Sequence, residues 1–272
     1  MGEFGDRMKG YEREEAGRRF LPLLPVNARI DGKGFSKFTK GLERPYDSRL
    51  SKLMCQTMAY LTQETQACIG YTQSDEISLV WYSADAKSQI FFDRRVQKMN
   101  SVLASMTTAF FNGMIPAHLP EKQDVFALFD CRVWQVPTLE EAANTILWRE
   151  YDATKNSISM AARHYYAHKA LHRKKANEMQ DMLFEKGVNW NDYPPFFKRG
   201  VFVQKRKIVR SFTKEEVKIL PEKHEVRKNP GLQVERTEYK QIDMPPFGSV
   251  RNRVDVIFSG AEPIFSGAEP IT

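Results

Sequence analysis

Three acidic residues occupy positions where predicted strands end or turn. Asp31 ends a run in which apolar and polar residues alternate, and Asp75 and Glu76 lie at the bend of a hairpin predicted in ACIGYTQSDEISLVWY. If these strands are neighbours in one sheet, the three carboxylates converge. Carboxylate oxygens suit the hard cation Mg²⁺, and two such ions roughly 3.5–4 Å apart stabilise both the attacking and the leaving oxygen of a phosphoryl transfer. The pattern therefore points to metal-dependent phosphoryl transfer.

The loop after Asp31 contains two glycines. Gly32 and Gly34 carry no side chain, so a triphosphate or a metal ion can approach the main chain closely there. A lone Gly-x-Gly is a weak signal, however. Spacing alone favours a simpler interpretation, with an ordinary turn at residues 31–32 and a solvated bend at residues 74–76. Further motifs have to decide between the two.

The elements that would position these residues follow from the apolar pattern. In chain order they are a strand over 25–38 that ends in a tight loop, a helix from a cap at Asp47 to about Thr65, the hairpin, a helix over about 93–112, a strand over 124–134, a long helical region opened by the capping-box pair Thr138 and Glu141, and a helix over about 174–186. This alternation predicts a compact α+β layer with added helices.

The C-terminal part gives weaker signals. FVQKRKIVRSF, over 202–212, is strand-like and basic, and periodicity fades from about Leu220. The string IFSGAEP occurs twice in succession, over 257–263 and 264–270, which is far too short for a solenoid repeat. We expect residues 221–272 to be a tail.

Composition restricts the class of protein. The chain has 272 residues and a formal net charge of +7, which favours a polyanionic partner, although many basic proteins bind no nucleic acid. No run approaches the roughly 18 apolar residues of a membrane helix, so we expect a cytoplasmic protein without membrane contact. Cys55, Cys68 and Cys131 are odd in number and widely spaced, which excludes a disulfide framework and a C-x-x-C metal site.

Two further groups of residues allow more than one interpretation. His164, His168 and His172 would share one face of a helix and could bind zinc, but the surrounding Lys and Arg residues favour an RNA-facing surface instead. Phe196 and Phe197 follow two prolines beside basic residues. Stacking on bases is one interpretation for them, and packing in the core is favoured.

Several motifs together resemble the tRNA-histidine guanylyltransferase family. In chain order they are RIDGKGFSKFTKG, RPYD, GYTQSDEISLV, FDCRV, WREYDATKNS and KGVNWNDYPPFFKRG, within about residues 5–203. This resemblance implies a palm-like catalytic domain, related to ordinary polymerases and nucleotide cyclases, that adds nucleotides to an RNA 5' end. It further implies two Mg²⁺ ions, ATP and GTP or other nucleoside triphosphates as substrates, a tRNA partner and a homotetramer.

The resemblance also assigns site residues, position by position. Asp31 and Asp75 match the metal-binding carboxylates, Gly32 matches the glycine that offers a backbone carbonyl, and Glu76 matches a supporting acidic neighbour. The nucleotide-binding positions that it implies are Asp31, Gly32, Lys33, Gly34, Phe35, Ser36, Arg44, Asp47, Ser74, Asp75, Arg95 and Lys98. Arg44 stands where the family usually has lysine, and a cation there would hold triphosphate oxygens. Arg95 and Lys98 also fit a solvated helix face.

One departure bears on the substrate. Eukaryotic members have His-Ile-Asn-Asn after an Arg-Gln-x-Asp stretch, whereas this chain has Thr154, Lys155, Asn156 and Ser157 after Arg-Glu-Tyr-Asp. The missing histidine favours the relatives that repair 5'-truncated tRNA by templated addition. A tRNA-histidine guanylyltransferase is the alternative within the family. Outside it are two alternatives. A nucleotide cyclase would use the same metal-binding carboxylates, whereas a non-catalytic RNA-binding protein with a palm fold would not need both Asp31 and Asp75.

The expected organisation has three parts. Residues 5–136 form the palm-like catalytic domain, residues 137–220 form a helical part of the same unit that contacts tRNA, and residues 221–272 form the tail.

Overall fold

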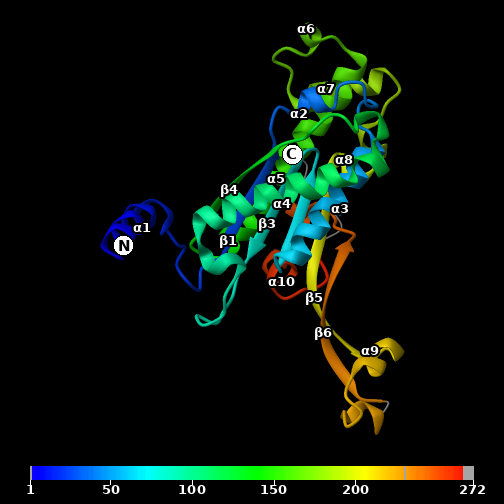
Figure 1. Ribbon diagram of the computed structural model, residues 1–272. Coiled ribbons are helices and arrows are strands. Elements are labelled where there is room, and N and C mark those ends of the chain that lie inside the picture. Colours follow the sequence, from blue (N-terminus) through cyan, green and yellow to red (C-terminus); the bar gives the residue numbers. More distant parts are fainter. Residues whose placement is uncertain (1, 230, 266–272) are drawn as a thin grey trace.

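A six-stranded antiparallel sheet forms the centre of the computed structural model, which describes residues 2–229 and 231–265 (Figure 1). The strands follow the order β4-β1-β3-β2-β5-β6. Their bounds are β1 (Val26–Gly32), β2 (Ile69–Gln73), β3 (Glu76–Trp81), β4 (Phe129–Gln135), β5 (Val201–Ser211) and β6 (Gln233–Ile242). The predicted α+β class is confirmed, as is the hairpin of β2 and β3.

One face of the sheet is covered by α3 (Ser48–Glu64) and α4 (Val96–His118). Alternate residues of the strands point toward these helices, among them Ile30 and Ile77, and they form a core with Leu53 and Phe111. The predicted cap at Asp47 is confirmed, because its carboxylate accepts a hydrogen bond from the N–H of Arg49 at 2.9 Å. The other set of alternate residues, which includes Asp31, therefore faces away from α3 and α4.

The opposite face packs against α5 (Leu139–Tyr165) and α10 (Arg253–Phe258). Thr138 caps α5 as predicted, accepting from the N–H of Glu141 at 3.1 Å. The buried Glu150 of α5 accepts from the N–H of Phe247 at 3.0 and 2.9 Å with its two oxygens. This clamp joins the middle of α5 to the segment that follows β6.

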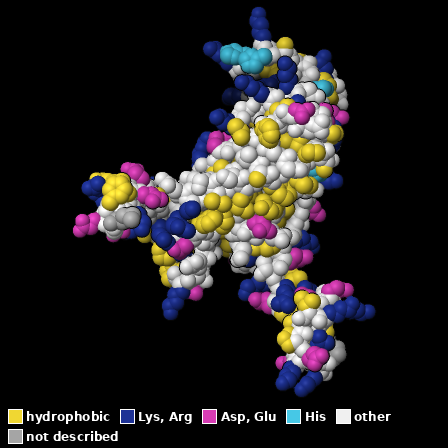
Figure 2. All heavy atoms as spheres, viewed as in Figure 1, with side chains coloured by type: hydrophobic (Ala, Val, Ile, Leu, Met, Phe, Trp, Pro, Cys, Tyr) yellow, Lys and Arg dark blue, Asp and Glu magenta, His cyan; other side chains and the backbone are white. Residues whose placement is uncertain are grey.

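The distal half of α5 continues past the sheet and packs against further short helices. Ile158 and Leu183 share a third core with Trp190 and Phe197. The short helices beside α5 are α6 (His168–Leu171), α7 (Ala176–Glu185) and α8 (Pro195–Lys198). A further short helix, α2 (Phe35–Phe38), follows β1. Lys and Arg side chains gather with histidines at the end of the molecule that carries α6 (Figure 2).

Strands β5 and β6 form a long two-stranded ribbon. They pair from Phe202 with Ile242 to Ser211 with Gln233, whereas β2 pairs only with residues 201–204 of β5. The distal part of the ribbon, capped by α9 (Lys214–Ile219), therefore projects beyond the sheet (Figure 1). Helix α1 (Gly2–Ala16) also stands apart from the body and has no buried residue.

The interpretation of residues from about 221 onward as a tail is wrong over the described part. β6 completes the sheet, and Val256 and Ile257 of α10 are buried against α5. The apolar pattern does not predict α10, because this helix is six residues long and too short to show a helical period. The second copy of IFSGAEP lies largely outside the described residues, from residue 266 onward.

No helix within residues 2–229 and 231–265 is long and apolar enough to span a bilayer. The three cysteines are free thiols.

Candidate active site

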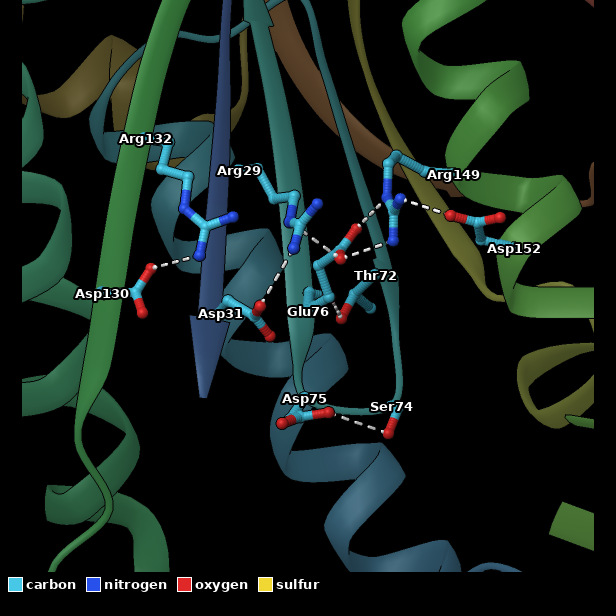
Figure 3. Close-up of polar contacts among 10 residues, drawn as sticks. All are labelled: Arg29, Asp31, Thr72, Ser74, Asp75, Glu76, Asp130, Arg132, Arg149 and Asp152. Atoms are coloured by element: carbon cyan, nitrogen blue, oxygen red, sulfur yellow. Dashed lines mark hydrogen bonds and ion pairs between the residues drawn. The ribbon is translucent and has the colours of Figure 1, made fainter. Parts of the chain in front are cut away.

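The three acidic residues meet at one end of the sheet, as the sequence predicts (Figure 3). Asp31 of β1 lies opposite Glu76 of β3 in the strand register, and the N–H of Gly32 donates to the backbone oxygen of Asp75 at 3.2 Å. The β1 strand end and the β2–β3 turn are thereby fixed side by side. Because β1 and β3 are adjacent and antiparallel, the end of one strand coincides with the start of the other.

The main chain at Gly32 approaches the Asp75 carboxylate closely. A Cβ built on Gly32 would stand 2.8 Å from Asp75 Oδ2, so only glycine leaves this space open. Ser74 holds a positive φ of 54° at the turn, and its hydroxyl donates to Asp75 Oδ1 at 3.0 Å. Burial raises the pKa of Asp75, and the neighbouring charges of Asp31 and Glu76 raise it further, against the bond from Ser74.

Glu76 is held by two arginines. Arg149 of α5 donates to its two carboxylate oxygens at 2.6 and 2.7 Å, and Arg29 Nε lies 3.1 Å from Glu76 Oε2. Arg29 also donates to Asp31 Oδ2 at 3.1 Å, and Arg149 to Asp152 at 2.7 Å (Figure 3). Burial raises the pKa of Glu76 despite these contacts. The geometry thus gives Glu76 a positioning role between Asp31 and α5.

The donor set at the two aspartates fits Mg²⁺. Asp75 Oδ2 and Asp31 Oδ1 accept no hydrogen bond from the described residues, and the Gly32 carbonyl lies beside them in the chain. Within the described part of the chain, no group of three or more His, Cys, Asp or Glu residues is close enough to hold a metal ion alone. Mg²⁺ commonly uses one or two carboxylates with water and substrate phosphates, so two aspartates suffice.

A cleft runs from these carboxylates along α5. One cavity of about 370 Å³ is lined by Asp31, Asp75 and Glu76 and by Asn156, Met160 and Arg163. A second, of about 340 Å³, shares Asp75 and Met160 with the first and extends over Ser36, Arg44 and Asp47. Continuous space next to the carboxylates provides room for a nucleotide.

In the predicted nucleotide-binding loop, one residue fixes the loop in the core and another lines the cleft. Phe35 is buried among Phe38, Phe111 and Phe129, which fixes the loop in the core, and Ser36 beside it lines the cleft. Lys33 and Gly34 are exposed and line none of the cavities described above. Arg44 is exposed at the cleft, in line with a phosphate contact.

Asp47 has a structural role that uses both its oxygens. It accepts from the N–H groups of Glu43 and Arg49 and from the Arg49 guanidinium at 2.8 and 3.1 Å. Burial opposes ionisation of Asp47, but these bonds prevail and lower its pKa. Asp47 therefore fixes the loop that carries Arg44.

Arg95 and Lys98 are not brought to the carboxylates. Arg95 shares a cavity with Trp81, at the end of β3 opposite to Glu76, and its Nε donates to the backbone oxygen of Phe92 at 3.4 Å. Lys98 is exposed one turn further along α4. The sequence pattern predicts their helix but not the direction in which it crosses the sheet. In the structure this direction places the N-terminus of α4 away from the carboxylates.

Sequence reasoning missed the contribution of α5 to the cleft. Arg149, Asn156, Met160 and Arg163 line it together with Arg29 of β1. Their spacing of seven, four and three residues repeats every two turns of a helix and places them on one face. The spacing could be found in the sequence, but three of the four residues on this face are polar, so the face shows no apolar pattern.

The other predicted groups have structural explanations. α5 ends at Tyr165 and α6 begins at His168, so His164, His168 and His172 do not lie on one continuous helix. Phe197 is buried and packs on Tyr46 with Phe196, which confirms the core interpretation for Phe197.

Ser157, one of the departures from the eukaryotic motif, is a buried joint. Its hydroxyl accepts from Trp190 Nε1 at 3.1 Å and donates to Thr154 at 2.8 Å. Neither Ser157 nor Thr154 is among the described residues that line the cleft, whereas Asn156 is.

An antiparallel sheet backed by helices, with two aspartates meeting beside an open cleft, defines a palm-like nucleotidyltransferase. The family model for tRNAHis guanylyltransferase matches residues 5–137. The tRNA(His) guanylyltransferase of Schizosaccharomyces pombe is 30% identical over 207 residues, which cover 71% of this chain and 77% of that protein. The chain belongs to the tRNAHis guanylyltransferase family and is an enzyme of the nucleotidyltransferase class.

Two solved structures agree with this assignment. A bacterial tRNA(His) guanylyltransferase-like protein in complex with ATP is 41% identical with a TM-score of 0.70, over 75% of this chain and 87% of that one. Another, in complex with GTP, is 32% identical with a TM-score of 0.68, over 90% and 94% respectively. The predicted palm-like fold is confirmed.

Proposed function

We propose that this enzyme adds nucleotides to the 5' end of tRNA in the 3'-to-5' direction, repairing truncated tRNA with the opposite strand as template. The observation that carries the proposal is the cleft itself: Asp31 and Asp75 stand at the start of a cavity that continues along α5. Such a cleft has room for a nucleotide and for the end of an RNA strand. The similarity to guanylyltransferase-like proteins bound to ATP and GTP supports nucleoside triphosphates as substrates.

In this reaction the 3'-hydroxyl of the incoming nucleotide attacks the activated 5' phosphate of the tRNA. A 5'-triphosphate end loses pyrophosphate. A 5'-monophosphate end is first joined to AMP from ATP, which releases pyrophosphate, and it then loses that AMP when the 3'-hydroxyl attacks. Base pairing to the opposite strand chooses the nucleotide.

Asp31, Asp75 and the Gly32 carbonyl would hold two Mg²⁺ ions, which when bound supply charge stabilisation for the reacting phosphate. Arg149 and Arg29 hold Glu76 against Asp31 and so fix the direction of the Asp31 carboxylate. Arg44 contacts phosphate oxygens at the other side of the cleft.

A templating assay tests the proposal. Purified enzyme receives a tRNA that lacks its first nucleotide, with each of the four bases in turn at the opposing position. We expect the added nucleotide to follow the opposing base, because a mismatch loses on the order of 1–2 kcal/mol of pairing and stacking, about tenfold from pairing alone.

Addition of a single G to histidine tRNA is the second candidate, favoured by the names of the relatives. Guanine added opposite any base, and to histidine tRNA alone, would establish that activity and contradict repair. Release of a cyclic nucleotide, or binding of RNA without any addition, would contradict both.

The family resemblance also supports a homotetramer that acts in the cytoplasm, which light scattering and fractionation test. Residues 137–220, which include α5, would provide most of the tRNA contacts, and residues 5–136 would carry the catalytic carboxylates.

A further inference from the structure

A third cavity adjoins the cleft at the end of α5. It has a volume of about 340 Å³ and is lined by Arg44, Pro45, Met160, Arg163 and His164. Met160 and Arg163 also line the cavity of the aspartates, and Arg44 and Pro45 also line the cavity that contains Ser36. The third cavity is thus a side branch of the cleft, enclosed by the loop before α3 and the last turns of α5.

Of the residues that the structure describes, two arginines and no acidic residue line this branch. Its ionisable lining residues are two arginines and one histidine, from two separate elements. Neither Arg44 nor Arg163 forms an ion pair or a side-chain hydrogen bond with any residue in the described ranges. By contrast, Arg29 and Arg149, which line the neighbouring cavity, are both paired with carboxylates.

The position of Arg163 connects the branch to the chemistry. Asn156, Met160 and Arg163 are spaced by four and three residues and lie on one face of α5. At 1.5 Å per residue, Arg163 stands about 10 Å further along the helix than Asn156. A substrate that extends from the aspartates along α5 therefore reaches Arg163 after leaving the reacting centre.

We infer that Arg163 and Arg44 form a phosphate-binding subsite, with His164 at its edge. The inference rests on the proposed function and names a specificity residue for it. Two guanidiniums from different elements suit a phosphate group, because each offers a fork of N–H donors and neither is paired with a carboxylate of residues 2–229 or 231–265. The phosphate belongs either to the 5' end of the RNA or to the nucleoside triphosphate, and the test separates these sources.

The test compares Arg163→Gln with Lys155→Gln. Lys155 is an exposed cation on the same helix that lines none of these cavities, so its removal controls for the loss of one positive charge. Binding is measured without turnover for three ligands: truncated tRNA with a 5'-triphosphate, the same tRNA with a 5'-hydroxyl, and GTP alone. Arg163→Lys and the double variant with Arg44→Gln complete the set.

If the phosphate is that of the RNA, Arg163→Gln weakens binding of the 5'-triphosphate tRNA about tenfold, by the value of one charged hydrogen bond. The preference over the 5'-hydroxyl tRNA falls equally, GTP binding stays unchanged, and Arg163→Lys restores part of the loss. If the phosphate is that of the nucleotide, GTP binding weakens instead. The effects of Arg163 and Arg44 should be less than additive in either case, because they share one ligand.

The inference would be overturned if Arg163→Gln bound each of the three ligands as tightly as the wild type does. It would also be overturned if Lys155→Gln lost as much affinity as Arg163→Gln. The proposed function can fail independently of the subsite. If the wild-type enzyme distinguishes the 5' ends through Arg163 but adds no nucleotide, the subsite is supported and the polymerase activity is contradicted.

Discussion

The carboxylate of Asp75 occupies the space that a side chain at position 32 would need. An ideal Cβ on Gly32 lies 2.8 Å from Asp75 Oδ2 and 2.4 Å from a ring carbon of Phe35, which is itself fixed in an aromatic core. The backbone of β1 and the β2–β3 turn are therefore in direct contact at the metal-binding position that we propose.

Gly32→Ala should inactivate the enzyme while the protein still folds. The added methyl must displace Asp75 or Phe35, and a misplacement of about 1 Å can cost roughly a hundredfold in rate. Single-turnover nucleotide addition measures the loss, and circular dichroism checks the fold. Gly113→Ala on α4 is the control, since a Cβ there meets nothing within 4 Å. Comparable activity of the two variants would contradict the importance of the contact.

Asp31→Asn and Asp75→Asn should each lower the rate of nucleotide addition by a factor of about a thousand or more, because each removes a principal charge-stabilising group. Thermal stability should hardly fall for Asp75→Asn, because burial already raises the pKa of this carboxyl and its charge is unfavourable in the folded state. Asp124→Asn, on an exposed loop, is the matched control. Substantial turnover by either active-site variant would remove the two-metal assignment.

The duplicated IFSGAEP provides a stability test with an internal control. Ile257 in the first copy is 1% exposed, whereas Ile264 at the same place in the second copy is 59% exposed. Ile257→Ala should lower the free energy of unfolding by about 2–4 kcal/mol through loss of burial and a residual cavity. Ile264→Ala should change it by less than about 0.5 kcal/mol. Denaturant titration compares the two, and equal effects would show that α10 is not part of the core.

The stability of the protein should decrease between about pH 4.5 and pH 7 through Glu150. Burial raises the pKa of this carboxyl to about 7, against hydrogen bonds from Phe247 and Gly248 and the charge of Arg199. In that interval the unfolded chain releases the proton that the folded chain keeps, so unfolding becomes easier as the pH rises.

Glu150→Gln removes this dependence and retains an acceptor for Phe247. The variant should therefore gain stability relative to the wild type as the pH rises from 5 to 8, by on the order of 1–3 kcal/mol. Melting curves at both pH values check it. A difference between variant and wild type that is the same at pH 5 and pH 8 would rule out titration of Glu150 in this range.

Strands and long helices of the palm were predictable because their signals are local. The alternation through Ile30 and the caps at Asp47 and Thr138 lie within a few residues of the elements they define. The meeting of Asp31 with Asp75 also followed, given two neighbouring strands. The distance of Arg95 from the carboxylates could not be predicted from the sequence, because only the packing of α4 on the sheet decides which end of the helix faces them.

The remaining site residues depend on long-range contacts. Arg149 acquires its role from Glu76, which is 73 residues earlier, and Glu150 from Phe247, which is 97 residues later. No local window contains such pairs, so a charged dipeptide on a helix gave no sign that its two members face different parts of the molecule.

The contacts of Arg149 and Glu150, which are neighbours on α5, limit where the chain can accept insertions. The distal ribbon, over 206–211 and 233–238, forms strand pairs only between its own two strands, so added residues at its tip lengthen a projection without moving the sheet. Residues 243–250 are different, because Phe247 is clamped to Glu150 while adjacent Arg149 holds Glu76. A single residue inserted there would pull on α5 one position from the active site, so length variation among relatives should concentrate in the ribbon and spare this segment.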